Sequence, residues 1–180
     1  MAIRLRRRLP TGETRPWTLT EIVQGKPLEH PSHPMFVHFP VAFYIATLAL
    51  DVLSKLGRFP SAPVATTWLL LGAFGASLVA ITTGLVDRAT TRRGSKVRKR
   101  VNQHMYLQFV TAGLFVVNFA IRWSDRHLAE ARPLWLILDV IGVATLVVGQ
   151  YLGGILVYVV GLRVGESGPA TSRVEEPDNP

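Results

Sequence analysis

Two histidines and one aspartate at the ends of apolar segments have the side chains needed to bind a cofactor. His38 lies about one turn inside the first apolar segment, His104 opens the third, and Asp87 closes the second. A b-type haem needs two histidines at the same depth on facing helices, each imidazole oriented by a further hydrogen-bonding group. The most specific hypothesis for these residues is therefore haem b binding and electron transfer at a site formed by His38, His104 and Asp87, with a redox protein or another membrane protein as partner; without haem, no cofactor is expected.

Two other interpretations of these residues remain open. His33, His38 and His104 could supply nitrogen ligands to a divalent metal such as zinc, nickel or iron. Alternatively, the polar groups form only hydrogen bonds between helices, in a non-catalytic structural or assembly subunit that binds partner membrane helices. No serine stands in a recognisable nucleophile-elbow or catalytic-base setting, so a hydrolase or transferase is disfavoured.

The third apolar segment, residues 104–123, carries a polar seam along an otherwise apolar helix. At about 100° per residue, one face collects His104, Gln108, Thr111, Asn118 and Arg122. The segment rises about 30 Å, which is the thickness of the hydrocarbon core. Because lipid cannot hydrogen-bond to these groups, the seam must face other helices or a cavity. A transport path along it is disfavoured, since the sequence shows no inverted repeat.

Charged residues at the opposite end of the helices should form a buried pair. A charge deep in the membrane costs about 2.5–3.5 kcal/mol on insertion scales, so such residues usually pair. Arg122 and Asp139 lie at similar depth in the third and fourth segments, and Gln150 shares the face of Asp139. We therefore expect an Arg122–Asp139 ion pair that fixes these two helices to each other. Asp51, on the first segment, is predicted to project away from the face of His38.

Composition and charge place the chain in a membrane. Of its 180 residues, 48% are hydrophobic and only 18% are charged, whereas soluble domains usually carry about 25% charged residues. The net charge of +8 lies in runs of Lys and Arg between apolar segments, which is typical of the positive-inside rule rather than of nucleic-acid binding. With both termini in the cytoplasm, 15 of the 20 basic residues lie inside. We therefore expect a multi-pass protein of a bacterial cytoplasmic membrane, in contact with lipid and without nucleic acid.

Four apolar segments predict an all-α, four-helix integral membrane bundle. The expected membrane domain covers residues 34–163, with helices at about 35–56, 65–86, 104–123 and 134–160. Residues 1–33 should form a basic cytoplasmic arm, in which Thr18 and Glu21 have the spacing of a capping box and predict a short interfacial helix. Residues 164–180 are polar and acidic, which predicts a disordered cytoplasmic tail.

Small residues on two of the helices predict close contacts between helix backbones. The set comprises Gly72, Ala76, Ala80 and Gly84, spaced four apart in the second segment, and the GxxxG motif of Gly149 and Gly153 in the fourth. Such faces let neighbouring helices approach closely. They make a homo-oligomer, formed through these faces, one of the expected arrangements.

A likeness to a known family spans residues 25–165. Its most specific parts are two sequence blocks: HPMFVHFP at His33–Pro40 and GGILVYVVG at Gly153–Gly161. They resemble a bacterial membrane family, the one described as domain of unknown function 2231. The resemblance implies a four-helix membrane protein. Similar domains can be fused to Rieske-type iron–sulfur modules, so the resemblance also implies redox work. This chain has no cysteine, which excludes disulfides and thiolate-ligated clusters within it.

Overall fold

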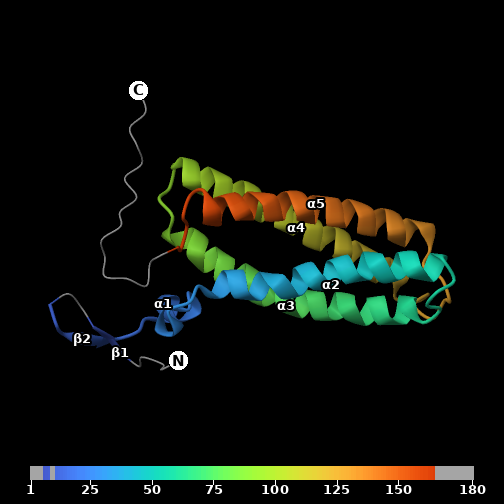
Figure 1. Ribbon diagram of the computed structural model, residues 1–180, viewed down its shortest axis with the longest axis horizontal. Helices are drawn as coiled ribbons and strands as arrows, with labels where there is room; N and C mark the ends of the chain where they lie inside the picture. Colours follow the sequence, from blue (N-terminus) through green and yellow to red (C-terminus); the bar gives the residue numbers. More distant parts are fainter. Residues whose placement is uncertain (1–5, 9–10, 165–180) are drawn as a thin grey trace.

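Four long antiparallel helices form the body of the protein. The computed structural model describes residues 6–8 and 11–164. The helices are α2 (Ser32–Lys55), α3 (Ala62–Thr90), α4 (Lys96–Arg122) and α5 (Pro133–Tyr158) (Figure 1). Each of them is long and apolar enough to cross a membrane. The predicted four-helix membrane bundle is confirmed, and the protein is a multi-pass membrane protein.

Short elements precede the bundle along the chain. They are β1 (Arg6–Arg8), β2 (Thr14–Pro16), α1 (Leu19–Val23) and the 3-10 helix η1 (Lys26–Leu28). The two strands pair antiparallel and were not expected from the sequence. The capping box is confirmed, because the Thr18 hydroxyl accepts from the Glu21 amide and the Glu21 carboxylate accepts from the Thr18 amide. The predicted short N-terminal helix is therefore present.

The helix bounds differ from those expected by about one to four residues, except at the start of α4, where the difference is larger. α4 begins eight residues before His104, because the Ser95 side chain accepts a hydrogen bond from the Arg98 amide at 3.1 Å and caps a basic first turn. α2 begins at Ser32 and continues through Pro40, so the proline does not set the start of the helix. The predicted disordered tail lies outside the described residues, apart from Val164.

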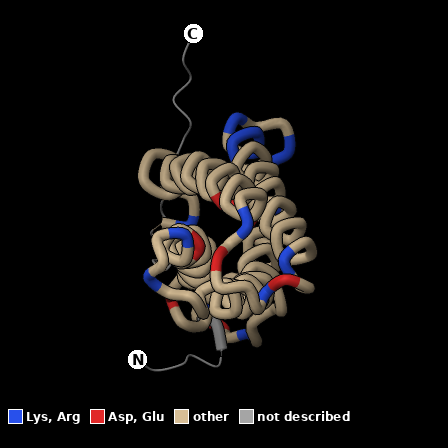
Figure 2. The backbone as a smooth tube through the Cα atoms, turned by 90° about the vertical axis from the view of Figure 1, so that its right-hand side faces the viewer, with Lys and Arg blue, Asp and Glu red and all other residues tan. Residues whose placement is uncertain are grey.

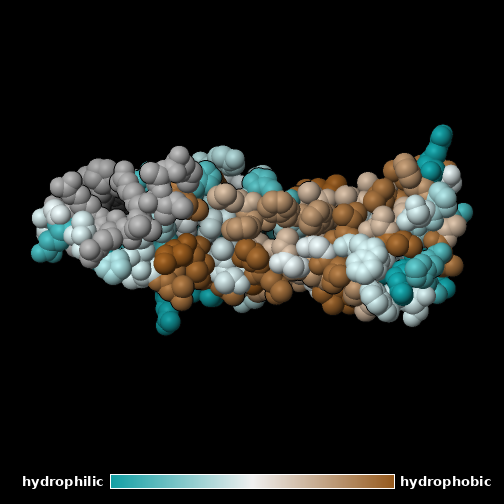
Figure 3. Space-filling model, turned by 90° about the horizontal axis from the view of Figure 1, so that it is seen from below, coloured by the Kyte–Doolittle hydropathy of each residue, from teal (hydrophilic) through white to brown (hydrophobic). Residues whose placement is uncertain are grey.

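The outer surface of the bundle suits lipid. Charged residues lie mainly in the loops and at the ends of the helices (Figure 2), and an apolar band occupies the middle of the molecule (Figure 3). Large apolar side chains such as Leu78, Val116 and Val147 are more than half exposed. A soluble protein rarely exposes so much contiguous apolar surface, so these faces contact the hydrocarbon of a bilayer.

The bundle consists of two helix hairpins packed against each other. α2 packs mainly against α3, and α4 packs mainly against α5. A central apolar cluster joins the two hairpins and contains Tyr44, Leu70, Ala73, Phe115 and Leu146. The rings of Tyr44 and Phe115 stack at a centroid distance of 4.1 Å. This layer separates two polar regions, one towards each end of the bundle.

Labelling single cysteines will test the topology, because the native chain has no cysteine. The loops at Ser61 and Arg93 are exposed and lie at opposite ends of the bundle. The positive-inside rule predicts Arg93 in the cytoplasm and Ser61 outside. A membrane-impermeant maleimide added to intact cells should label Ser61→Cys but not Arg93→Cys. The reverse labelling would contradict the orientation, and labelling of both from one side would contradict the four-span topology.

Candidate functional site

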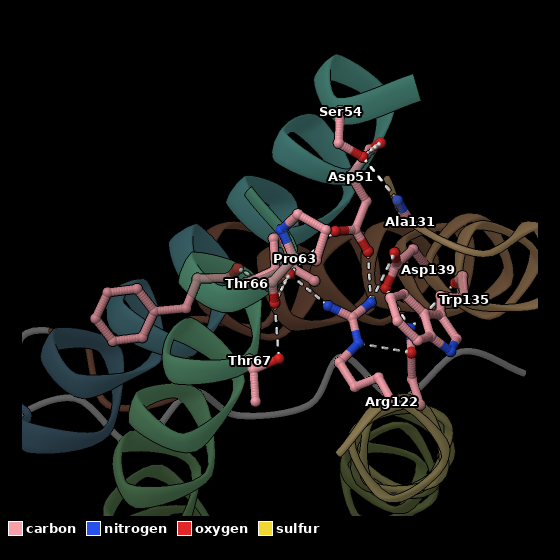
Figure 4. Close-up of polar contacts among 12 residues, drawn as sticks. Asp51, Ser54, Pro63, Thr66, Thr67, Arg122, Ala131, Trp135 and Asp139 are labelled. Carbon is pink, nitrogen blue, oxygen red and sulfur yellow. Dashed lines mark hydrogen bonds and ion pairs between the residues drawn. The ribbon is translucent and has the colours of Figure 1, made fainter. Parts of the chain in front are cut away.

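A fully buried arginine connects all four long helices at one end of the bundle (Figure 4). Arg122 of α4 forms an ion pair through Nη2 with Asp51 of α2, and the same nitrogen lies 3.6 Å from Oδ2 of Asp139 on α5. Its Nη1 donates a hydrogen bond to the hydroxyl of Thr66 on α3. Arg122, Asp51 and Asp139 have no exposed side-chain surface. The guanidinium is therefore the common contact of α2, α3, α4 and α5.

Neighbouring polar groups complete this cluster. Arg122 Nε donates to Asn118 Oδ1 at 3.1 Å, and Asn118 Nδ2 donates to Asp139 Oδ1 at 2.6 Å and to the Trp135 carbonyl at 3.1 Å. The guanidinium carbon lies 4.9 Å from the centre of the Trp135 ring. A buried charge is tolerated only when its hydrogen-bonding groups are paired in this way. The cluster therefore positions the helices, whatever else it does.

The predicted Arg122–Asp139 contact is present, but Asp51 makes the shorter contact and sequence reasoning missed it. Asp51 projects away from His38 as predicted, but His38 is exposed, so the face that carries Asp51 is the one that looks inward. Counted from His33 instead, Asp51 is 18 residues later, which is five full turns at 3.6 residues per turn. Asp51 and His33 therefore lie on the same face of α2, and this spacing was the signal that could have revealed the contact.

A cavity of about 150 Å³ lies between the two hairpins, on the other side of the Tyr44–Phe115 layer. Its wall includes His33 and His104 and reaches Tyr44, 11 residues or about 16 Å further along α2. Most of the lining side chains are apolar. The charged and amide side chains lie towards the histidines: Asp87, Arg88, Gln108, Gln150 and Arg163. At the other end Tyr44 and Ser77 join their hydroxyls in a hydrogen bond of 3.1 Å, so the charged groups are confined to one end of the cavity.

The two histidines face each other across this cavity in matching environments. His33 Nδ1 lies 2.9 Å from the Ala80 carbonyl oxygen, and His104 Nδ1 lies 2.8 Å from the Gly149 carbonyl oxygen. The ring centroids are 6.5 Å apart, with an angle of 81° between the ring planes. Since a carbonyl only accepts hydrogen bonds, each Nδ1 carries the proton, and each neutral ring keeps its lone pair on Nε2. Neither Nε2 hydrogen-bonds to any residue that the structure describes.

Each imidazole also packs against a glycine four residues beyond the carbonyl that it contacts. A Cβ atom added to Gly84 would lie 2.9 Å from His33 Cε1, and one added to Gly153 would lie 3.0 Å from His104 Cε1. These distances are too short for a side chain without movement of the ring. Gly84, Gly149 and Gly153, which the sequence marked as small helix-contact residues, therefore serve contacts within this chain.

The two hairpins repeat one arrangement. On α2 and α4 the facing pairs are His33 with His104, Tyr44 with Phe115, and Asp51 with Arg122, each 71 residues apart. On α3 and α5 the equivalent pairs are Ala80 with Gly149 and Gly84 with Gly153, each 69 residues apart. Contacts between equivalent positions are those of an approximate two-fold axis along the bundle, as in membrane proteins built from parallel repeats. Because this repeat is parallel, the absence of an inverted repeat in the sequence does not bear on it.

The structure keeps Asp87 at the cavity with His104 but places His38 outside it. His38 is exposed, lies outside the cavity, and is 3.4 Å through Nδ1 from the Met35 carbonyl of its own helix. Five residues after His33, it projects about 140° around α2 from that residue. The structure therefore brings His104 together with His33, not with His38. Asp87 lines the cavity, and its Oδ1 is 3.2 Å from Nε of Arg163 in the segment after α5.

The remaining members of the polar seam also face the interior. Thr111 is buried and its hydroxyl lies 3.0 Å from that of Thr145 on α5. Gln108 and Gln150 line the cavity. Gln108 Nε2 is buried and has no hydrogen-bond partner among the described residues. Within the same residues, no three His, Cys, Asp or Glu side chains are grouped to hold a metal ion.

Comparison with known proteins gives one match. The family model "Predicted membrane protein (DUF2231)" matches residues 29–166, which include all four long helices, both histidines and the arginine cluster. The chain matches no curated protein and no solved structure. The match supports the membrane fold and assigns no activity.

Replacing Arg122 by Met should strongly destabilise the bundle. The substitution leaves Asp51 and Asp139 buried without their cation, and breaking a buried ion pair from one side costs about 3–5 kcal/mol. The free energy of unfolding in detergent should fall accordingly. Lys55→Ala is the control, because the Lys55–Glu130 pair is exposed and should contribute about 1 kcal/mol or less. Equal melting temperatures for the two variants would contradict the role given to Arg122.

Replacing Gly84 by Ala should displace the His33 ring and break its contact with the Ala80 carbonyl. Gly75→Ala on the same helix is the control, since no atom lies within 4 Å of its added Cβ. Alanine favours a helix over glycine by about 1 kcal/mol, so Gly75→Ala should match or exceed the native melting temperature. Gly84→Ala should melt at a lower temperature than this control. A variant as stable as Gly75→Ala would show that the ring does not need the glycine.

Proposed function

The chain belongs to the DUF2231 family of predicted membrane proteins, and we propose from its own geometry that it binds b-type haem and transfers electrons. His33 and His104 are the proposed axial ligands. Asp87 lies at the charged end of the same cavity, and His38 has no part in the site. In the orientation predicted by the positive-inside rule, this cavity lies towards the cytoplasmic side, where a redox partner would exchange electrons with it.

The observation that carries this proposal is the spacing of two imidazole rings whose Nδ1 atoms are held by backbone carbonyls. Both Nδ1–H groups face backbone carbonyls, so both Nε2 atoms act as electron-pair donors. With metal–nitrogen bonds of about 2.0–2.1 Å and a ring centre about 1.1 Å behind each nitrogen, two imidazoles on opposite sides of a metal have centroids about 6.3 Å apart. The observed separation is 6.5 Å. Perpendicular ring planes are compatible with such axial ligation.

The number of available ligands favours haem over a bare metal ion. Zinc and similar ions in proteins take three or four protein ligands, and the described residues offer no cluster of three. A porphyrin supplies four nitrogens of its own and needs only the two axial imidazoles. The apolar walls around the histidines, which include Val37, Val41 and Leu146, would contact the porphyrin faces and edges. A divalent metal site is therefore the second candidate.

The size of the cavity sets a condition on binding. A cavity of about 150 Å³ is smaller than a porphyrin, so haem binding requires the apolar side chains of the cavity wall to move aside while His33 and His104 keep their separation. The arginine cluster at the far end would hold the two hairpins at that separation. When bound, the haem would supply one-electron chemistry; the protein would supply the fixed imidazoles and a site of low polarity.

Absorption spectra of purified protein, expressed with ample haem, will test the proposal. The native protein should show a Soret band and, after reduction with dithionite, a sharp α-band. His33→Ala and His104→Ala should each lose these bands, whereas His38→Ala, the matched control on α2, should keep them. Metal analysis of the same samples distinguishes the second candidate. A native protein without haem and without metal would contradict both, and would favour a structural subunit that binds partner helices.

A further inference from the structure

Charged side chains border the end of the cavity that lies beyond the histidines. Asp87 and Arg88 belong to the last turns of α3, and Arg163 follows the end of α5. All three line the cavity. No similar charge borders the opposite end, which is closed by the Tyr44–Phe115 stack. A ligand with one charged edge would therefore orient that edge towards Asp87, Arg88 and Arg163.

Arg163 is held at this position by contacts with two other parts of the chain. Its Nε lies 3.2 Å from Asp87 Oδ1, and its Nη2 donates to the Gln24 carbonyl at 3.3 Å. The side chains of Arg163 and Asp87 are only 8% and 10% exposed. The backbone of Arg163 has a φ of 64°, which is uncommon for a residue with a side chain. The fold thus places a nearly buried guanidinium in the cavity wall and pairs it with a carboxylate.

Arg88 provides a second guanidinium in the wall of the cavity. Its Nε donates to Asn102 Oδ1 at 2.8 Å, which orients the group. Neither of its Nη nitrogens hydrogen-bonds to any residue within the described part of the chain. Two guanidinium groups at one end of an apolar cavity favour an anionic group, and carboxylates bind arginine through two parallel hydrogen bonds. The Asp87 carboxylate already forms an ion pair with Arg163, which shows that this guanidinium can bind a carboxylate.

We infer that Arg88 and Arg163 form a carboxylate-binding subsite at the charged end of the histidine cavity. This inference rests on the proposed haem binding and extends it: the two propionates of haem b would lie at these arginines, and the apolar edge would lie towards Val41 and Tyr44. A propionate would join Asp87 at Arg163 and would not displace it, because displacement would leave the nearly buried Asp87 carboxylate without its cation. The subsite would fix which way round the porphyrin lies between His33 and His104.

The test compares two ligands that differ only in these carboxylates. Detergent-purified apoprotein is titrated with iron protoporphyrin IX and with its dimethyl ester, and binding is followed through the Soret band. The native protein should bind the free acid at least about tenfold more tightly than the ester, because charge-assisted hydrogen bonds are lost in the ester. Equal affinities for the two porphyrins would overturn the subsite while leaving haem binding intact. Failure to bind either porphyrin would overturn the haem proposal, and the subsite with it.

Variants of the two arginines test whether these residues cause the preference for the free acid over the ester. Arg88→Gln and Arg163→Gln should each reduce the ratio of the affinity for the free acid to the affinity for the ester. The double variant should bring this ratio close to one. Arg92→Gln is the matched control, because Arg92 is exposed in the α3–α4 loop and does not line the cavity. If Arg163→Gln does not fold with Asp87 left unpaired, the double replacement Asp87→Asn and Arg163→Gln removes both charges together. An unchanged preference in these variants would overturn the assignment.

Discussion

Burial of the Arg122 guanidinium within the membrane-spanning region is the constraint on which the structure depends. A cation in this region must be neutralised, and each of its N–H groups must find an acceptor, because lipid offers none. Asp51, Thr66, Asn118 and Asp139 meet that need, and they come from all four long helices. The positions of these helices at one end of the bundle are therefore fixed by polar contacts. Hydrophobic burial cannot do this in lipid, where the exterior is as apolar as the core.

The repeat of the two hairpins carries this constraint to the cavity. Contacts between equivalent positions of α2 and α4 form three layers along the bundle, which are the ion pair, the stacked rings of Tyr44 and Phe115, and the facing histidines. The first two layers hold the hairpins together directly. The third does not, because its imidazoles contact backbone carbonyls within their own hairpins. Of the three layers, the histidine layer is therefore the one in which the polar side-chain contacts stay within each hairpin.

The sequence predicts the architecture well because apolar length and basic loops are local signals. Contacts between helices depend on helix phase, and there the sequence was less informative. A haem site that includes His38 uses the exposed face of α2, whereas His33 and Asp51 lie on the face that looks inward. The repeat also escaped notice, since equivalent positions hold different residues, with Asp51 opposite Arg122. Only the geometry shows that these residues are equivalent. Arg163 could not be anticipated as a partner of Asp87, because nothing local in the sequence indicates that the chain returns to α3 after α5.

The most direct test of the histidine pairing is electron paramagnetic resonance of the oxidised, haem-loaded protein at low temperature. Two axial imidazoles whose planes are nearly perpendicular leave two iron orbitals close in energy, and this produces a highly anisotropic low-spin ferric signal. The observed angle of 81° between the rings of His33 and His104 predicts that signal. A high-spin ferric signal would show that one histidine does not bind the iron. It would contradict the claim that the two hairpins each contribute one ligand.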